Sequence, residues 1–159
     1  MTSGTCFTAL LVYVDDILVA SDSMDSITTI KDCLHDKFKI KDLKTLRYFL
    51  GIEVAPSPKV IHIYQRKYAL DIVVDSGVLV SKPAKIPMEQ NLKFRKDDGM
   101  PLTDPSVYRR LIGMLLYLTI TPPDISYPIQ TLSQFMDKPT TVHLAAAHKF
   151  LQYINVAPG

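Results

Sequence analysis

Two adjacent carboxylates, Asp15 and Asp16, stand inside the otherwise apolar segment TALLVYVDDILVA. Side chains of neighbouring strand residues point to opposite faces, but a tight turn can present both at one exposed tip. Carboxylates this close repel each other, and apolar surroundings penalise their charge unless a cation compensates it. A hard divalent cation with oxygen ligands, such as Mg²⁺, would do so. An ordinary turn that faces water is the alternative, and the residue types alone favour it, because Asp is common in turns.

The segments around this pair predict how it is positioned. Branched and aromatic residues on both sides predict a β-hairpin over residues 8–20. Capping side chains at residues 21–23 and apolar residues at helical spacing then predict a helix that ends near Phe38. Further extended segments are predicted at residues 38–41, 48–55 and 60–65. A phosphoreceiver domain, in which an acidic pair ends a strand, is set aside because residues 17–20 continue as strand.

The second half of the chain has helical patterns in place of strand patterns. Helices are predicted at residues 66–76, 105–118, 124–136 and 140–154, with a proline-punctuated loop between residues 81 and 105. Asp104 followed by Pro105 is a strong helix start, and Pro128 should kink or shift the start of the helix that contains it. The predicted fold class is therefore α/β in the α+β sense, with a mixed part over residues 1–64 and a helical part over residues 65–159.

Composition sets broad limits on the class of protein. The chain has 159 residues, of which 47% are hydrophobic and 21% charged, as in an ordinary folded soluble protein. Its apolar runs are shorter than the ~20 residues that cross a bilayer, and its N-terminus lacks a secretory signal pattern. Cys6 and Cys33 are expected to be reduced thiols of an intracellular protein. The histidines have no metal-binding spacing, and a net charge of +2 permits a nucleic-acid partner without arguing for one.

The segment FTALLVYVDDILVASD resembles the YxDD hairpin of reverse transcriptases in its copia-type form, with Val14 at the variable position. The resemblance continues in the family's order and spacing through KDLKTLRYFLGIEV, IHIYQRKYALDIV, DPSVYRRLIGMLLYLTITPPDISYPIQTLSQFM and KPTTVHLAAAHKFLQYI. It implies part of a right-hand polymerase. Residues 1–64 would be the C-terminal part of the palm, with its antiparallel YVDD hairpin, and residues 65–159 the helical thumb and the start of the connection region.

The resemblance also implies roles for single residues. Asp15 and Asp16 would be catalytic carboxylates that help to hold two Mg²⁺ ions, one at the primer 3′-hydroxyl and one at the nucleotide triphosphate. Tyr13 and Val14 would lie near the primer end and the incoming nucleotide. The implied partners are an RNA/DNA primer–template and deoxynucleoside triphosphates, without a membrane. The residues that resemble the primer grip are Phe49, Leu50, Gly51 and Ile52.

Glycine and basic residues near this segment have alternative explanations. Gly51 would let backbone approach the nucleic acid closely, or it is a bulge glycine without a ligand. Arg66 and Lys67 open a predicted helix, where the dipole disfavours cations, so that a phosphate backbone across this end would compensate them. A solvated basic turn, screened by salt, is the alternative.

Parts of the family pattern have no counterpart in the sequence. The third catalytic Asp belongs to a segment like LDVKNAFL before the hairpin, and basic residues of the fingers bind the triphosphate; neither is present. Lys44 replaces a Gly and Pro122 an Arg that the family favours. We therefore expect a chain that is inactive alone, with an exposed sheet face and edge and the missing N-terminal half as a further partner. The alternative is a non-catalytic nucleic-acid-binding remnant of a transposable element.

Overall fold

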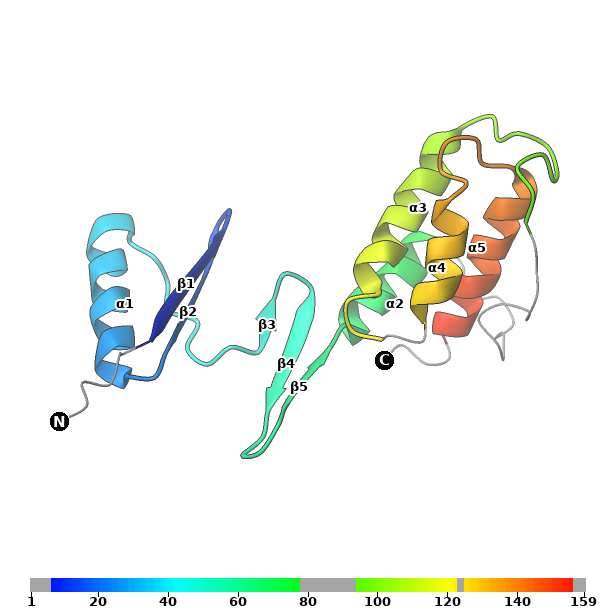
Figure 1. Ribbon diagram of the computed structural model, residues 1–159. Coiled ribbons are helices and arrows are strands. Elements are labelled where there is room, and N and C mark those ends of the chain that lie inside the picture. The colour runs from blue at the N-terminus through cyan, green and yellow to red at the C-terminus, as the bar shows by residue number, and fades with distance from the viewer. Residues whose placement is uncertain (1–6, 78–93, 123–124, 156–159) are drawn as a thin grey trace. The chain divides into compact units, whose positions relative to one another are not determined.

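The computed structural model describes residues 7–77, 94–122 and 125–155 (Figure 1). The chain divides into two compact units, residues 1–49 and 50–159, and each is described by itself. The sequence predicted a change of character at residue 65. The boundary between the compact units comes earlier in the sequence, after residue 49, because the second strand hairpin packs with the helices that follow it. The assignment of palm and thumb to these parts stays a prediction.

The described residues of the first unit form a β-hairpin, a helix and a short final strand. Strand β1 (Thr8–Tyr13) pairs antiparallel with β2 (Asp16–Ser21), in a register that runs from Thr8 opposite Ser21 to Tyr13 opposite Asp16. The open end is tied by a hydrogen bond between the Thr8 and Ser21 hydroxyl oxygens, 2.9 Å apart. The Phe7 N–H also donates to the Asp22 carboxylate at 3.0 Å. The predicted hairpin is therefore present, and its ends are joined by side chains as well as by the strand ladder.

Helix α1 (Met24–Phe38) follows the hairpin directly. Ser23 caps it by accepting a hydrogen bond from the Ser26 N–H, as the sequence predicted. The helix ends at Lys39, which adopts the left-handed region with φ of 54° and donates its N–H to the His35 carbonyl. The predicted extended segment at residues 38–41 is therefore wrong, because Phe38 is still helical and the left-handed residue ends the helix without starting a strand.

Lys44 lies in a backbone conformation that suits glycine. Its φ is 67°, in the left-handed region, which is energetically unfavourable for a residue that has a Cβ atom. The Asp42 carboxylate accepts a hydrogen bond from the Lys44 N–H at 2.8 Å and pairs with the Lys31 ammonium at 3.1 Å. These contacts, the Lys44 bond first, hold the pKa of Asp42 below its usual value. The turn therefore has the geometry that a Gly would favour, with Lys44 held in it by Asp42.

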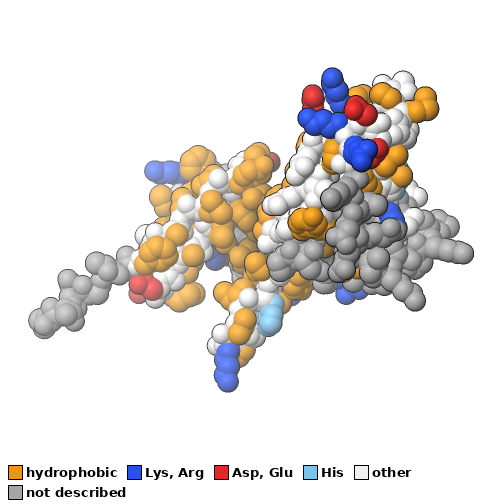
Figure 2. Space-filling view, turned by 45° about the vertical axis from the view of Figure 1, so that its right-hand side comes forward, with side chains coloured by type: hydrophobic (Ala, Val, Ile, Leu, Met, Phe, Trp, Pro, Cys, Tyr) orange, Lys and Arg blue, Asp and Glu red, His pale blue; other side chains and the backbone are white. Residues whose placement is uncertain are grey.

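Apolar side chains of the first unit are widely exposed. Leu10, Leu11, Val12 and Tyr13 of β1 are each 50–57% exposed. Helix α1 has no buried residue. Hydrophobic side chains are in view over large areas of the molecular surface (Figure 2). A two-stranded sheet that is apolar on both faces has little core to stabilise it, so we expect this unit to be the less stable of the two.

The second unit begins at a tight turn and continues as a hairpin. The first unit ends with the short strand β3 (Tyr48–Phe49). After the turn at residues 50–51, β4 (Ile52–Pro56) pairs antiparallel with β5 (Ile61–Tyr64). The sequence predicted one continuous strand over residues 48–55. That prediction is wrong at the turn, where two residues with positive φ reverse the chain.

Among the described residues of the second unit, four helices lie side by side (Figure 1). They are α2 (Arg66–Asp75), α3 (Pro105–Leu118), α4 (Ser126–Ser133) and α5 (Thr141–Ile154). Asp104 caps α3 by accepting from the Ser106 N–H at 2.9 Å, as predicted. The helix α4 is shorter than predicted, with Pro128 in its first turn, where a missing N–H is tolerated. The predicted cap at Asp124 and most of the predicted loop between residues 81 and 105 fall outside the described residues.

These helices enclose the main hydrophobic core. Its largest fully buried members include Tyr108, Phe150, Ile112 and Leu115. The Tyr108 hydroxyl donates to the Leu132 carbonyl at 2.8 Å, and burial raises the pKa of this phenol. In the described part of the chain, no helix is both long and apolar enough to cross a membrane.

His143 is a fully buried member of this core. Its ring stacks on Phe135, with centroids 4.0 Å apart. Its Nδ1 lies 3.1 Å from the Thr140 N–H, which donates to it, and its Nε2 lies 3.2 Å from the Arg95 carbonyl. This pattern assigns the proton to Nε2 in a neutral ring. Burial lowers the pKa of His143, although the Arg95 carbonyl and Asp98 oppose that shift.

We expect the stability of the second unit (the helical unit, residues 50–159) to fall as the pH drops below about 6.5, the ordinary pKa of histidine. Because the pKa of His143 is lowered in the folded state, the unfolded chain binds the proton first; stability is complete above that pH and is lost progressively below it. Urea denaturation followed by circular dichroism between pH 8 and pH 5 would measure this. His143→Gln should flatten the dependence, and His62→Gln, at an exposed position, should leave it unchanged. Equal slopes in both variants would contradict this.

Candidate functional site

The acidic pair lies at the tip of the first hairpin. Val14 and Asp15 form the two-residue turn, and Asp16 is the first residue of β2. The side chains of Asp15 and Asp16 are both exposed. Because Tyr13 and Asp16 are directly opposed across the strands, their side chains lie on one face of the hairpin. The tip therefore presents two carboxylates to solvent, one of them beside an aromatic ring.

Val14 has an unfavourable backbone conformation at this tip. Its φ is 49°, and 81% of its side chain is exposed. The left-handed region costs a residue with a Cβ about 1–2 kcal/mol, and β-branched residues are true outliers there. Hairpin turns normally place Gly, Asn or Asp at such a position. Strain of this kind clusters at functional sites, where it is retained because the conformation is needed.

The two carboxylates suit part of a magnesium ligand set. Mg²⁺ is typically bound by one or two carboxylates together with water and substrate phosphates. The described residues contain no group of three or more His, Cys, Asp or Glu side chains that could hold a metal ion. Asp15 and Asp16 can therefore supply oxygen ligands from the protein, whereas the remaining ligands would have to come from elsewhere.

Aromatic side chains of α2 and α3 hold the turn before β4, within the second unit. Leu50 and Gly51 both have positive φ, 50° and 80°, as in a type I′ turn. The Tyr117 hydroxyl donates a hydrogen bond to the Leu50 carbonyl. A Cβ on Gly51 would lie 3.4 Å from the Tyr117 ring and 3.7 Å from the Tyr68 ring. In this structure the chain's own tyrosines, with the positive φ, account for the glycine; an approach of nucleic acid to it stays a prediction.

The basic residues at the start of α2 lie beside β4. Arg66 and Lys67 are both exposed. The Lys67 N–H donates to the Glu53 carboxylate at 2.8 Å, which places a negative charge at the helix N-terminus. Glu53 therefore supplies negative charge at this helix end, where a bound phosphate or screening by salt was expected from the sequence. The predicted phosphate contact remains open, because both basic side chains face solvent.

Buried Gln65 joins this region to the end of α3. It is 1% exposed, and its amide nitrogen donates to the Tyr117 carbonyl at 3.4 Å. Its amide oxygen accepts from the Thr121 hydroxyl at 2.9 Å. Gln65 and Tyr117 were not predicted from the sequence, because no local pattern distinguishes them. The one available signal was a polar residue between an apolar strand and a helix.

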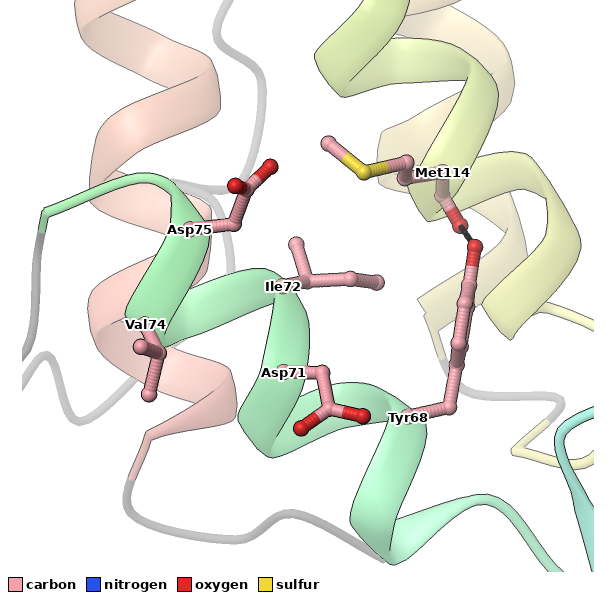
Figure 3. A pocket seen from close by; sticks show the side chains of 6 residues that line it. All are labelled: Tyr68, Asp71, Ile72, Val74, Asp75 and Met114. Carbon is pink, nitrogen blue, oxygen red and sulfur yellow. Dashed lines mark hydrogen bonds between the residues drawn. The ribbon is translucent and has the colours of Figure 1, made fainter.

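A shallow groove lies between α2 and α3 (Figure 3). It is lined by Tyr68, Asp71, Ile72, Val74, Asp75 and Met114. The Tyr68 hydroxyl donates to the Met114 carbonyl at 3.3 Å across it. Burial raises the pKa of Tyr68. Because the charged side chains that line the groove are acidic, it does not suit a phosphate.

The arginine pair of α3 makes contacts within the chain. Arg110 pairs with Asp75 at 2.6 Å. Arg109 donates to the Met136 carbonyl at 2.8 Å and to the Asp137 carbonyl at 3.1 Å. Both arginines are exposed, and both join α3 to neighbouring segments.

Comparison with known proteins identifies the family. The family described as reverse transcriptase (RNA-dependent DNA polymerase) matches residues 3–90, which include both hairpin tips. The chain is 41% and 38% identical, each over 155 residues, to the retrovirus-related Pol polyproteins from transposons RE1 and RE2 of Arabidopsis thaliana. It is 36% identical over 145 residues to an uncharacterized mitochondrial protein of the same plant. No solved structure gives a significant match.

The chain therefore belongs to the reverse transcriptase family, in the form found in copia-type retrotransposon polyproteins. The match to the two polyproteins covers 98% of this chain but 11% of each polyprotein. It covers 91% of this chain and 60% of the mitochondrial relative.

Proposed function

We propose that this chain supplies the metal-binding hairpin and part of the primer-contacting surface of an RNA-directed DNA polymerase. The observation that carries the proposal is the exposed pair Asp15 and Asp16, placed next to the strained Val14. Strain at an exposed tip has no folding benefit, so its retention favours a role for the tip in binding. The proposed substrates are a primer annealed to an RNA template and deoxynucleoside triphosphates.

Asp15 and Asp16 would hold Mg²⁺ through their carboxylate oxygens. When bound, the ions supply charge stabilisation at the attacking hydroxyl and at the leaving pyrophosphate. Tyr13 shares a face with Asp16 and is 57% exposed, so its ring can pack against the sugar or base at the primer end. Val14 exposes its side chain beside the carboxylates, where it can contact the incoming nucleotide.

The primer contact would be made by the second hairpin and the start of α2. The Leu50–Gly51 turn, which lies between Phe49 and Ile52 in the sequence, would present its backbone to the primer strand. The bond between Lys67 and Glu53 places the start of α2 beside β4, so Arg66 and Lys67 can contact phosphates near that hairpin. Such contacts release counterions, and their affinity falls as salt rises.

We propose further that these residues do not complete an active site by themselves. The described residues place no further metal-ligating side chain with Asp15 and Asp16 to make a group of three. Two carboxylates without another ligand would hold metal ions loosely and leave the reacting groups poorly positioned. A complete polymerase would add a third carboxylate and the residues that bind the triphosphate.

Two assays on the purified chain test this proposal. In the first, primer extension on an RNA template with Mg²⁺ should give no product. In the second, fluorescence anisotropy should detect binding to a primer–template duplex that weakens as salt rises. The double variant Arg66→Gln/Lys67→Gln should weaken binding several-fold, because it removes phosphate contacts. Each lost contact should also lower the slope of log affinity against log salt by about 0.9.

The double variant Lys96→Gln/Lys138→Gln removes the same charge at other exposed positions and serves as the matched control. Asp15→Asn should leave duplex binding unchanged. Extension that disappears in Asp15→Asn would show that the chain is sufficient for catalysis, against the second part of the proposal. Absence of salt-dependent binding would remove the proposed primer contact.

A further inference from the structure

We infer that Tyr117 is a positioning residue, which holds the Leu50–Gly51 turn in the place from which it contacts the primer. The inference rests on the proposed function of that turn. Its structural basis is a set of contacts that lies entirely within the second unit.

Tyr117 contacts the turn in two ways. Its hydroxyl donates to the Leu50 carbonyl, and its ring lies 3.4 Å from the position that a Cβ of Gly51 would occupy. Leu50 and Gly51, the two residues of the turn, both have positive φ. A residue such as Leu50 keeps a left-handed backbone only where surrounding contacts determine it. Tyr117 supplies contacts of this kind from α3, a helix distant in sequence.

Tyr117 is itself held on two sides. The Tyr68 ring meets it edge to face, with centroids 5.2 Å apart and planes at 80°. The Tyr68 hydroxyl is bonded to Met114, one turn earlier on α3 (Figure 3). The Tyr117 carbonyl accepts from buried Gln65, which also accepts from Thr121. The turn is therefore connected to the core of the helical unit through side chains that have little freedom to move.

Through these contacts, the positions of α2 and α3 would determine the position of the primer-contacting backbone. The outer face of the β4–β5 hairpin offers little support of its own, since Ile61 and Ile63 are 67% and 53% exposed. Loss of the Tyr117 hydroxyl would leave the Leu50 carbonyl without this donor, and the turn would then sample other conformations. The primer would meet the right contacts for less of the time, and its affinity would fall.

The test is Tyr117→Phe, which keeps the ring and removes only the hydroxyl, compared with Tyr127→Phe at a position 76% exposed. Hydrogen–deuterium exchange should become on the order of 2- to 10-fold faster at residues 50–55 in Tyr117→Phe, the range that one lost hydrogen bond gives. Amides of α5 should exchange at the wild-type rate. Duplex affinity should fall by a similar factor, with an unchanged salt slope because no charge is lost.

Each other outcome counts against a defined part of this inference. Unchanged exchange at residues 50–55 would overturn it, and so would equal acceleration in α5, which would indicate general destabilisation. Faster exchange in the turn with unchanged duplex affinity would overturn the positioning role, because the turn would then not determine primer binding. If the wild-type chain fails to bind duplex at all, the proposed function fails, and exchange alone decides whether Tyr117 holds the turn.

Discussion

Asparagine at Asp15 or Asp16 should lower the rate of nucleotide addition by roughly 10²–10³-fold in a polymerase that contains this chain, the loss typical of removing one preorganised electrostatic contact. Asparagine keeps the size of the side chain but removes the negative charge that attracts a metal ion. Because both side chains are exposed at a hairpin tip, the change should leave the fold intact.

The measurement needs a complete polymerase. The chain can replace the matching segment of the RE1 polyprotein, to which it is 41% identical over 155 residues. Primer extension on an RNA template would then be followed as a function of Mg²⁺ concentration. Asp36→Asn, at an exposed position of α1, serves as the control for charge. A chimera that is active with Asp16→Asn at the control rate would remove Asp16 from the metal site.

Phe150→Ala should lower the free energy of unfolding of the helical unit by about 3–5 kcal/mol. The Phe150 ring is fully buried in the core, so its removal loses apolar contacts and leaves a cavity that the packed helices cannot close. Urea denaturation followed by circular dichroism would measure the change.

Tyr127→Ala is the matched control, because this aromatic ring is 76% exposed and its truncation should change stability by less than about 0.5 kcal/mol. Hydrogen exchange would show which unit is affected. If Phe150→Ala instead accelerated exchange in α1 as much as in α3, the two units would not unfold separately, against the division of the chain at residue 49.

Periodic patterns predicted most of the local structure. Apolar residues that flank Asp15 and Asp16 predicted the first hairpin, and helical spacing predicted α1, α2, α3 and α5. These predictions succeeded because each depends on residues within a few positions of each other. The errors lie where single backbone conformations decide the outcome, at Lys39 and at the Leu50–Gly51 turn. Of the residue types at these positions, only Gly51 predicts a left-handed conformation.

The candidate site was predicted unevenly. The acidic pair and the basic start of α2 were recognised by residue type and family resemblance. The contact from Tyr117 to Leu50 joins residues 67 positions apart, and the bond from Gln65 to Tyr117 joins residues 52 apart. Such pairings depend on how helices pack, which local sequence does not encode. The histidine spacing did not predict a metal site, and the place of His143 between Thr140, Phe135 and Arg95 was not foreseen.

The sequence by itself determined the family, the two-carboxylate tip and the order of the elements, because these depend on residue type and on short-range spacing. Only the tertiary structure decided that Glu53 supplies the charge at the start of α2 and that tyrosines from two helices hold the Leu50–Gly51 turn. It also decided which apolar residues form a core. Those of the helical unit are buried by packing against one another. Equally apolar residues of β1 remain about half exposed, because the described strands and helix of the first unit are too few to cover them.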